Sequence, residues 1–393
     1  VLPCLLFFVP FRFLTGTDLS SWKVVFVLLL IIVVLAFGVA RALFRRFAPQ
    51  TPELVQIVCA ICLSIITQPA LYISSTTSAT YSIPIASAIV LAYTSIYLWL
   101  LASTATSRKK LLVYTALGGF STGLIVGCRP QVAIIIFLAP VILSSRLNDL
   151  KKKGQKYAWL TAAGAATASC LIAMIPFLWW NLIRFGKLLD FGARYQLTTM
   201  DMRVRRDIVS KLPFAFFQAL LAPLRVLDKF PFFAAIAGNG NSQGGYQGIY
   251  MAEPLLGGVL FWLPASWLIL FAIKRRVRAC ARNQTGVRAL LYSALGLCLV
   301  ILTIDTSATF LTRYVSDWGF LWGIASLSAI MMLDNAIEDK ALRRVLHTSV
   351  IALSLASICL CIVAMTMSGR FNQLSDSNPL LFTLLRDIFT VMN

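Results

Sequence analysis

Two short segments each hold a single arginine and no lysine, at positions where chemistry is plausible. Arg129 precedes a proline, while Arg313 and Tyr314 lie between Asp305 and Asp317. Arginine suits phosphate because its planar fork donates two hydrogen bonds at once and keeps its charge. The pattern predicts that Arg313 and then Arg129 bind an anionic group, with Tyr314 beside them and Asp317 in support. The alternative is a structural ion pair between Arg313 and Asp317, four residues apart.

A second group of candidates follows two tryptophans, in the stretch 177–196. Aromatic and basic side chains occur together in this stretch, a combination that suits the membrane interface, where lipid phosphates lie. The sequence thus predicts further contacts to an anionic lipid group here. The candidates are Arg194, Arg184 and Tyr195 for phosphate binding, with Asp190 as a supporting acid.

Helices that lie in a membrane must position these residues. Of the 393 residues, 59% are hydrophobic and 13% charged, whereas an ordinary soluble domain carries about 25% charged residues. The apolar residues come in long runs, close to the roughly 20 residues with which a helix crosses a bilayer. The sequence therefore predicts an all-α integral membrane protein with about ten transmembrane helices and additional extracytoplasmic surface helices. The predicted spans are 22–42, 54–72, 83–101, 111–127, 132–143, 157–178, 257–273, 289–303, 319–333 and 349–365.

The net charge of +20 is concentrated in alternate loops. Most lysines and arginines follow every second predicted span, whereas the short loops between hold just Arg129 and Arg313. Because cytoplasmic loops are enriched in basic residues, the basic set is predicted to be cytoplasmic and the two arginines extracytoplasmic. The chain is therefore predicted to lie in the cell (cytoplasmic) membrane, and no nucleic-acid partner is expected. The basic loops contain 41–46, 108–110, 146–156, 274–288 and 340–344.

The predicted spans divide the chain into five parts. The chain opens at Val1 without a methionine, so we expect either that it is the C-terminal part of a longer protein or that its start is mis-assigned. The parts are an interfacial segment (1–21), a six-helix transmembrane bundle (22–178), an extracytoplasmic loop with amphipathic helices and a glycine-rich stretch (179–256), a four-helix transmembrane bundle (257–366) and an extracytoplasmic C-terminal tail (367–393).

Three motifs together resemble those of GT-C type membrane glycosyltransferases. They are Gly-Leu-Ile-Val-Gly-Cys-Arg-Pro (123–130), the Arg-Phe-Gly, Phe-Gly and Arg-Tyr-Gln elements of 181–197, and Arg-Tyr-Val-Ser-Asp (313–317). The resemblance is to a bacterial branch, distantly related to protein mannosyltransferases and aminoarabinose transferases that use polyprenyl-phosphate sugars. It implies transfer of a hexosyl or pentosyl group from such a carrier to an extracytoplasmic acceptor. The partners would then be membrane lipid and the lipid-linked sugar.

The resemblance also implies how the chemistry is divided. A carboxylate would deprotonate the acceptor, and arginines would neutralise the phosphate leaving group. In the family this acid lies in the first extracytoplasmic loop, which here would precede Val1, so the catalytic residue is expected outside this chain. The sequence has no histidine and carboxylate cluster with metal-ligand spacing. It therefore indicates no cofactor and leaves a divalent metal open.

Two other functional classes stay open. A transporter or flippase of lipid-linked sugars would place ionisable groups near the bilayer midplane. The interiors of the predicted spans contain no such residue. A non-catalytic membrane scaffold in assembly of the cell envelope is the third interpretation.

Overall fold

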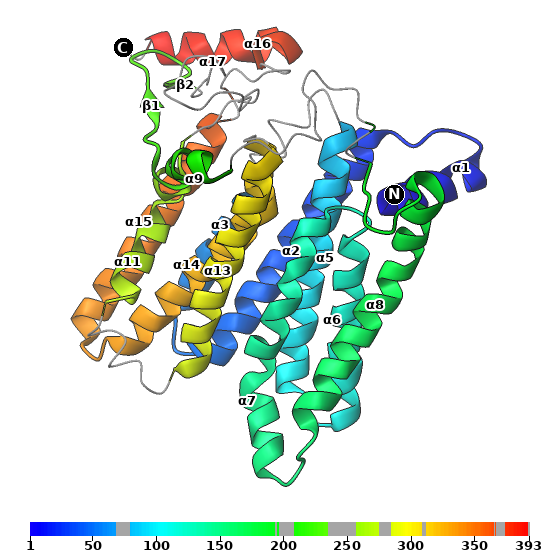
Figure 1. Cartoon of the computed structure of the whole chain (residues 1–393). Coiled ribbons are helices and arrows are strands. Elements are labelled where there is room, and N and C mark those ends of the chain that lie inside the picture. Colours follow the sequence, from blue (N-terminus) through cyan, green and yellow to red (C-terminus); the bar gives the residue numbers. More distant parts are fainter. Residues whose placement is uncertain are drawn as a thin grey trace.

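The computed structural model describes residues 1–67, 79–192, 195, 208–234, 257–274, 284–308, 312–364, 366 and 374–391. Within this part of the chain nearly all regular structure is helical (Figure 1). The exception is one antiparallel hairpin, β1 (Arg225–Val226) paired with β2 (Phe233–Ala234). The predicted all-α class is confirmed.

Seven helical stretches among the described residues are long and apolar enough to cross a membrane. Each of them corresponds to one of the predicted spans. They are α2 (Ser21–Phe47), Tyr81–Thr104 in α5 (Ala79–Thr104), Pro130–Lys152 from η2 (Pro130–Phe137) and α7 (Leu138–Lys152), α8 (Ala158–Phe185), Thr285–Thr306 in α13 (Thr285–Ala308), α14 (Val315–Ala336), and Lys340–Val363 in α15 (Lys340–Ala364).

The other three predicted spans have different structures. In the first, α3 (Glu53–Ile65) is shorter than the predicted 54–72, and residues 68–78 lie outside the described part. In the second, α6 (Arg108–Ile125) starts with three basic residues, which shortens its apolar part. In the third, the predicted continuous helix 257–273 is instead divided into α10 (Val259–Trp262), η5 (Pro264–Trp267) and α11 (Leu268–Ala272). Pro264 is the first residue of η5, and proline lacks the N–H that would continue the hydrogen bonds of the preceding turn.

The long helices lie side by side and share two ends (Figure 1). At one end α6 leads into η2 and α13 approaches α14; we call it the site end, because it holds Arg129 and Arg313. At the other end α7 turns back into α8 and α14 into α15; we call it the basic end. The basic segments 41–46, 108–110 and 340–344 lie in the terminal turns of α2, α6 and α15 at the basic end. The two sets of loops distinguished by charge therefore lie at opposite ends of the bundle.

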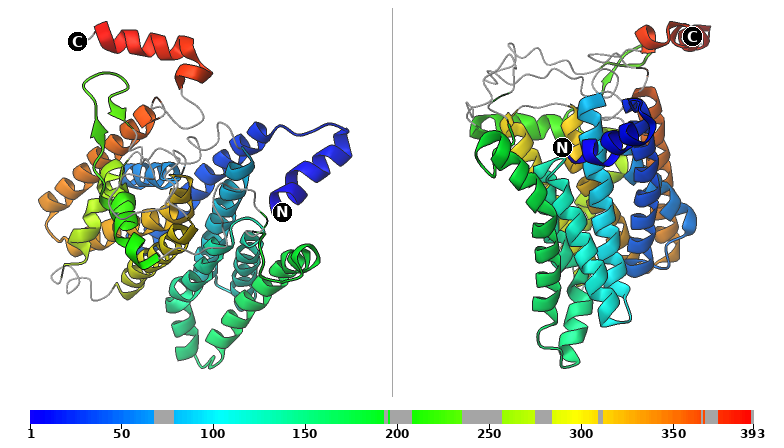
Figure 2. Two further views of the ribbon diagram at one scale, coloured as in Figure 1. Left: turned by 45° about the horizontal axis from the view of Figure 1, so that its top comes forward. Right: turned by 90° about the vertical axis from the view of Figure 1, so that its right-hand side faces the viewer.

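The C-terminal helix α17 lies beyond the site end, apart from the long helices (Figure 2), whereas Ala215 of α9 and Ala219 of η4 are buried in the core. The rings of Phe382 and Phe389 in α17 pack against the ring of Phe230, which lies in the turn between the two strands. Their centroids are 5.3 and 5.7 Å, respectively, from the centroid of Phe230. The short elements are η1 (Cys4–Phe8), α1 (Val9–Thr15), α9 (Ile208–Phe216), η4 (Phe217–Leu221), η7 (Thr312–Tyr314), α16 (Leu374–Ser377) and α17 (Pro379–Val391).

Helix α14 is the centre of the bundle. All its residues from Val315 to Asp334 are buried, and α3, α5, α11, α13 and α15 pack around it. Its sequence explains this position, since a helix that is apolar or small on every side is buried on every side. The first turn of this helix carries Asp317, so the candidate site begins on the most enclosed element of the fold.

Close packing of α6 against α8 fixes the backbone just before Arg129. A Cβ atom on Gly119 would lie 2.2 Å from the carbonyl oxygen of Ala166, and one on Gly123 would lie 2.2 Å from that of Cys170. Such distances leave no room for any side chain. Glycines at four-residue spacing permit such a close approach of two helices.

The substitution Gly123→Ala is expected to lower the free energy of unfolding by about 1 to 3 kcal/mol, because the methyl group forces two packed backbones apart. The matched control is Gly164→Ala on α8, where an added Cβ meets no atom within 4 Å. This control should be neutral or stabilise the helix by up to about 1 kcal/mol. Unfolding in mixed micelles of increasing SDS content measures both variants. Equal stability of the two would contradict the packing described here.

Candidate functional site

A buried ion pair joins two distant segments at the site end. Arg129 immediately precedes η2, and its Nε donates a hydrogen bond to Oδ1 of Asp317 over 3.0 Å. A second guanidinium N–H donates to Oδ2 of the same carboxylate. The side chain of Asp317 is 1% exposed and that of Arg129 is 19% exposed. A bidentate pair of this kind holds both groups in one orientation.

The charge of Arg129 is maintained by its partner. Burial by itself would lower the pKa of the guanidinium, but the charge and hydrogen bonds of Asp317 outweigh burial and raise this pKa. Asp317 in turn lies in the first turn of α14, where unpaired backbone N–H groups favour a negative charge. The pair is therefore a fixed feature of the site.

Gln131 extends the pair to a third helix. Its Nε2 donates to Oδ1 of Asp305 over 3.1 Å and to Oδ2 of Asp317 over 3.2 Å. Asp305 is near the end of α13 and is 5% exposed. Its Oδ2 is buried and has no hydrogen-bond partner within the described part of the chain. An unpaired buried acceptor is costly, so this oxygen is suited to accept a proton or a hydrogen bond from a bound molecule.

Two guanidinium groups lie near one tyrosine ring. The Cζ of Arg129 lies 5.1 Å from the ring centroid of Tyr314, and that of Arg313 lies 5.7 Å from it. Arg313 also lies 4.4 Å from the ring centroid of Tyr81, at the start of α5. Cations within about 6 Å of a ring face are attracted by its quadrupole. Arg313 is half-buried in this arrangement.

The structure thus brings together four of the predicted site residues, namely Arg313, Arg129, Tyr314 and Asp317. We call them, with Gln131, Asp305 and Tyr81, the arginine cluster. The carboxylate of Asp317 binds Arg129 across the bundle, whereas the sequence suggested Arg313, four residues away. The three added residues have a common signal in the sequence: each is polar and lies within a few residues of a predicted span end.

The remaining candidates make local contacts. Arg184 is exposed at the end of α8 and lies over the rings of Trp180 and Phe185, at 5.9 and 5.0 Å. Tyr195 stacks on Phe185 with 5.1 Å between centroids. Asp190 accepts a hydrogen bond from the backbone N–H of Gly192 over 2.9 Å, which is an ordinary turn contact. Arg194 and the glycine-rich stretch 238–248 lie outside the described residues.

The fold and this cluster together define a multi-pass α-helical membrane protein with a buried polar site at one end of its bundle. No family model, curated protein or solved structure matches the chain.

Proposed function

We propose that this protein is a membrane glycosyltransferase that takes a sugar from a polyprenyl-phosphate carrier at the arginine cluster. The observation that supports the proposal best is that Arg313 is half-buried and lies near the rings of Tyr81 and Tyr314, the second of which also contacts Arg129 of the buried ion pair. Basic loops are at the opposite end, so the positive-inside rule assigns the cluster to the extracytoplasmic side of the cell membrane. Lipid-linked donor and acceptor would meet there.

The two arginines would have different roles. Arg129 is already bound by a carboxylate through two hydrogen bonds, so it orients the site. The Cζ of Arg313 lies 4.4 Å from the ring centroid of Tyr81, and a planar guanidinium can donate paired hydrogen bonds to phosphate. In the reaction, the bond between the anomeric carbon and the phosphate oxygen breaks, and the acceptor bonds to that carbon. The acceptor's proton passes to a carboxylate, and Arg313 stabilises the charge of the leaving phosphate.

The substitution Arg313→Ala should reduce use of the lipid-linked donor about 10- to 150-fold, the effect of losing one charge-assisted hydrogen-bonding group. Arg313→Lys should restore part of the activity, because lysine keeps the positive charge but lacks the planar guanidinium that donates two hydrogen bonds at once. The measurement is transfer from a polyprenyl-phosphate sugar per folded molecule, in vesicles that contain the purified full-length protein.

Arg12→Ala is the matched control, because Arg12 is an exposed arginine in α1, also at the site end, paired with Asp18 on the surface. This variant should retain full transfer. Full transfer by Arg313→Ala as well would remove Arg313 from the site and, with it, the main support for an enzyme.

A transporter or flippase of lipid-linked sugars is the second candidate function. Asp305 favours it, since an acidic residue buried in a membrane helix with one unpaired oxygen is a common feature of ion and substrate pathways. The same vesicles distinguish the two functions. Movement of the donor between leaflets without release of polyprenyl phosphate would indicate transport.

A further inference from the structure

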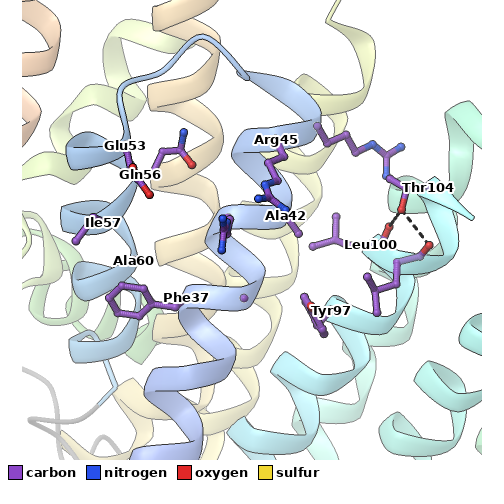
Figure 3. Close-up of a pocket in the computed structure, with 14 residues that line it drawn as sticks. Phe37, Ala42, Arg45, Glu53, Gln56, Ile57, Ala60, Tyr97, Leu100 and Thr104 are labelled. Carbon is purple, nitrogen blue, oxygen red and sulfur yellow. Dashed lines mark hydrogen bonds between the residues drawn. The ribbon is translucent and has the colours of Figure 1, made fainter.

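A groove of about 510 Å³ lies at the basic end, away from the arginine cluster. Helix α2 forms its middle, with α3 on one side and α5 on the other (Figure 3). The small residues Gly38 and Ala42 of α2 leave this space open, while Tyr97 of α5 closes one side against Gly38. The groove is therefore built from three helices that pack on one another.

The lining of the groove changes from charged to apolar along α2. Arg41, Arg45 and Arg46 lie toward the end of the helix. Phe37 lies about two turns deeper than Arg45, at 1.5 Å per residue, and the neighbouring helices add further apolar residues to the lining. These are Ile57 and Ala60 of α3 and Tyr97 and Leu101 of α5.

The positive charges in this groove are largely uncompensated. Arg41 and Arg45 are exposed, and neither has a hydrogen-bond or ion-pair partner within the described residues. Arg46 donates from Nη2 to Oγ of Ser145 over 2.7 Å, while its Nη1 is buried without a partner in that same part of the chain. Among the residues that line the groove, Glu53 is the acidic one. An anion would therefore be attracted to the mouth of the groove.

We propose that this groove binds an anionic phospholipid, with its phosphate against Arg41 and Arg45 and an acyl chain along Phe37, Ile57 and Tyr97. A soluble phosphate would form ion pairs with the arginines but would leave the apolar lining of the groove uncovered. A zwitterionic lipid would cover that lining, but its headgroup has no net charge and would be attracted less strongly to the arginines. Basic pockets between membrane helices on the cytoplasmic side suit anionic headgroups, and each basic residue near such a surface adds about fivefold to affinity.

The test is a titration of the purified full chain, in neutral detergent, with phosphatidylglycerol, followed by native mass spectrometry. The double variant Arg41→Gln/Arg45→Gln should bind this lipid about 25-fold more weakly. The matched control is Lys151→Gln/Lys152→Gln, which removes the same charge from exposed positions at the same end. That control should bind within about twofold of the unmodified protein, the limit expected for distant surface charge.

A second variant, Ala42→Trp, fills the groove and leaves all three arginines in place. It should also bind phosphatidylglycerol more weakly, while phosphatidylcholine should bind the unmodified protein at least about tenfold less tightly than phosphatidylglycerol. Because Arg41 and Arg45 are exposed, the arginine variant is expected to fold normally, as thermal unfolding without lipid would show. If the lysine control bound phosphatidylglycerol as weakly as the arginine variant does, the lipid would be held by non-specific electrostatic attraction, and the proposal would be overturned. Displacement of the lipid by millimolar inorganic phosphate would overturn it in favour of a phosphate site.

Discussion

The substitution Arg129→Ala is expected to lower the free energy of unfolding by about 3 to 5 kcal/mol, because it leaves a buried carboxylate without its cation. Asp317 is 1% exposed and lies on the central helix, so it has no route to water without disturbing the bundle. Gln131 would remain as a donor to this carboxylate, but a neutral amide cannot balance its charge. Equilibrium unfolding in mixed micelles measures the loss.

A double-mutant cycle provides the control for this prediction. The double variant Arg129→Met/Asp317→Leu removes both charges and should recover most of the stability, because two apolar side chains replace a buried pair at little net cost. Arg184→Ala, at an exposed position on α8, should change the unfolding free energy by less than about 0.5 kcal/mol. A loss below about 1 kcal/mol for Arg129→Ala would contradict the buried pair.

The second large effect is expected at the basic end, at Asp334. This fully buried carboxylate accepts a hydrogen bond from Oγ1 of Thr51 over 2.6 Å and lies 2.8 Å from Nε2 of His347. The Nε of Arg343 lies 3.6 Å away. Asp334 therefore connects the turn before α3 and helix α15 to the end of α14.

The substitution Asp334→Ala should cost about 3 to 5 kcal/mol of unfolding free energy, since three polar groups lose their common partner. Asp149→Ala is the control, because this acid is exposed near the same end of the bundle; its effect should stay below about 0.5 kcal/mol. Hydrogen exchange adds a local measurement, in which the first turns of α15 should lose protection in the Asp334 variant before the rest of the bundle does. Uniform loss across all helices would argue against this local role.

Much of the fold could be predicted from the sequence, because lipid imposes a minimum length on apolar helices and charge distinguishes alternate loops. The predicted span 257–273 is apolar throughout but is not one continuous helix, since a new helical piece begins at Pro264. Hydropathy averages over a window and does not register one missing N–H. The short hairpin at 225–234 was also beyond prediction, since strands of two residues leave almost no periodic signal.

The candidate site could be predicted in its residue types and not in its pairings. Arg129 and Asp317 are 188 residues apart, and their contact depends on which helix ends become neighbours. Local spacing offered Arg313 as an alternative partner of Asp317, because residues four apart are neighbours on one helix. Arg313 instead precedes α14, in η7, where its guanidinium lies over the rings of Tyr81 and Tyr314. The groove beside α2 was equally hidden, because it exists only where three helices meet.

Helix α14 has a buried acid at each end, Asp317 at the site end and Asp334 at the basic end. Sliding this helix along its axis by a single residue, about 1.5 Å, would strain the hydrogen bonds at both ends at once. The helix is thus expected to stay stationary while the protein works. Motions that admit or release a bound molecule should therefore come from elements at the periphery of the bundle and not from this central helix.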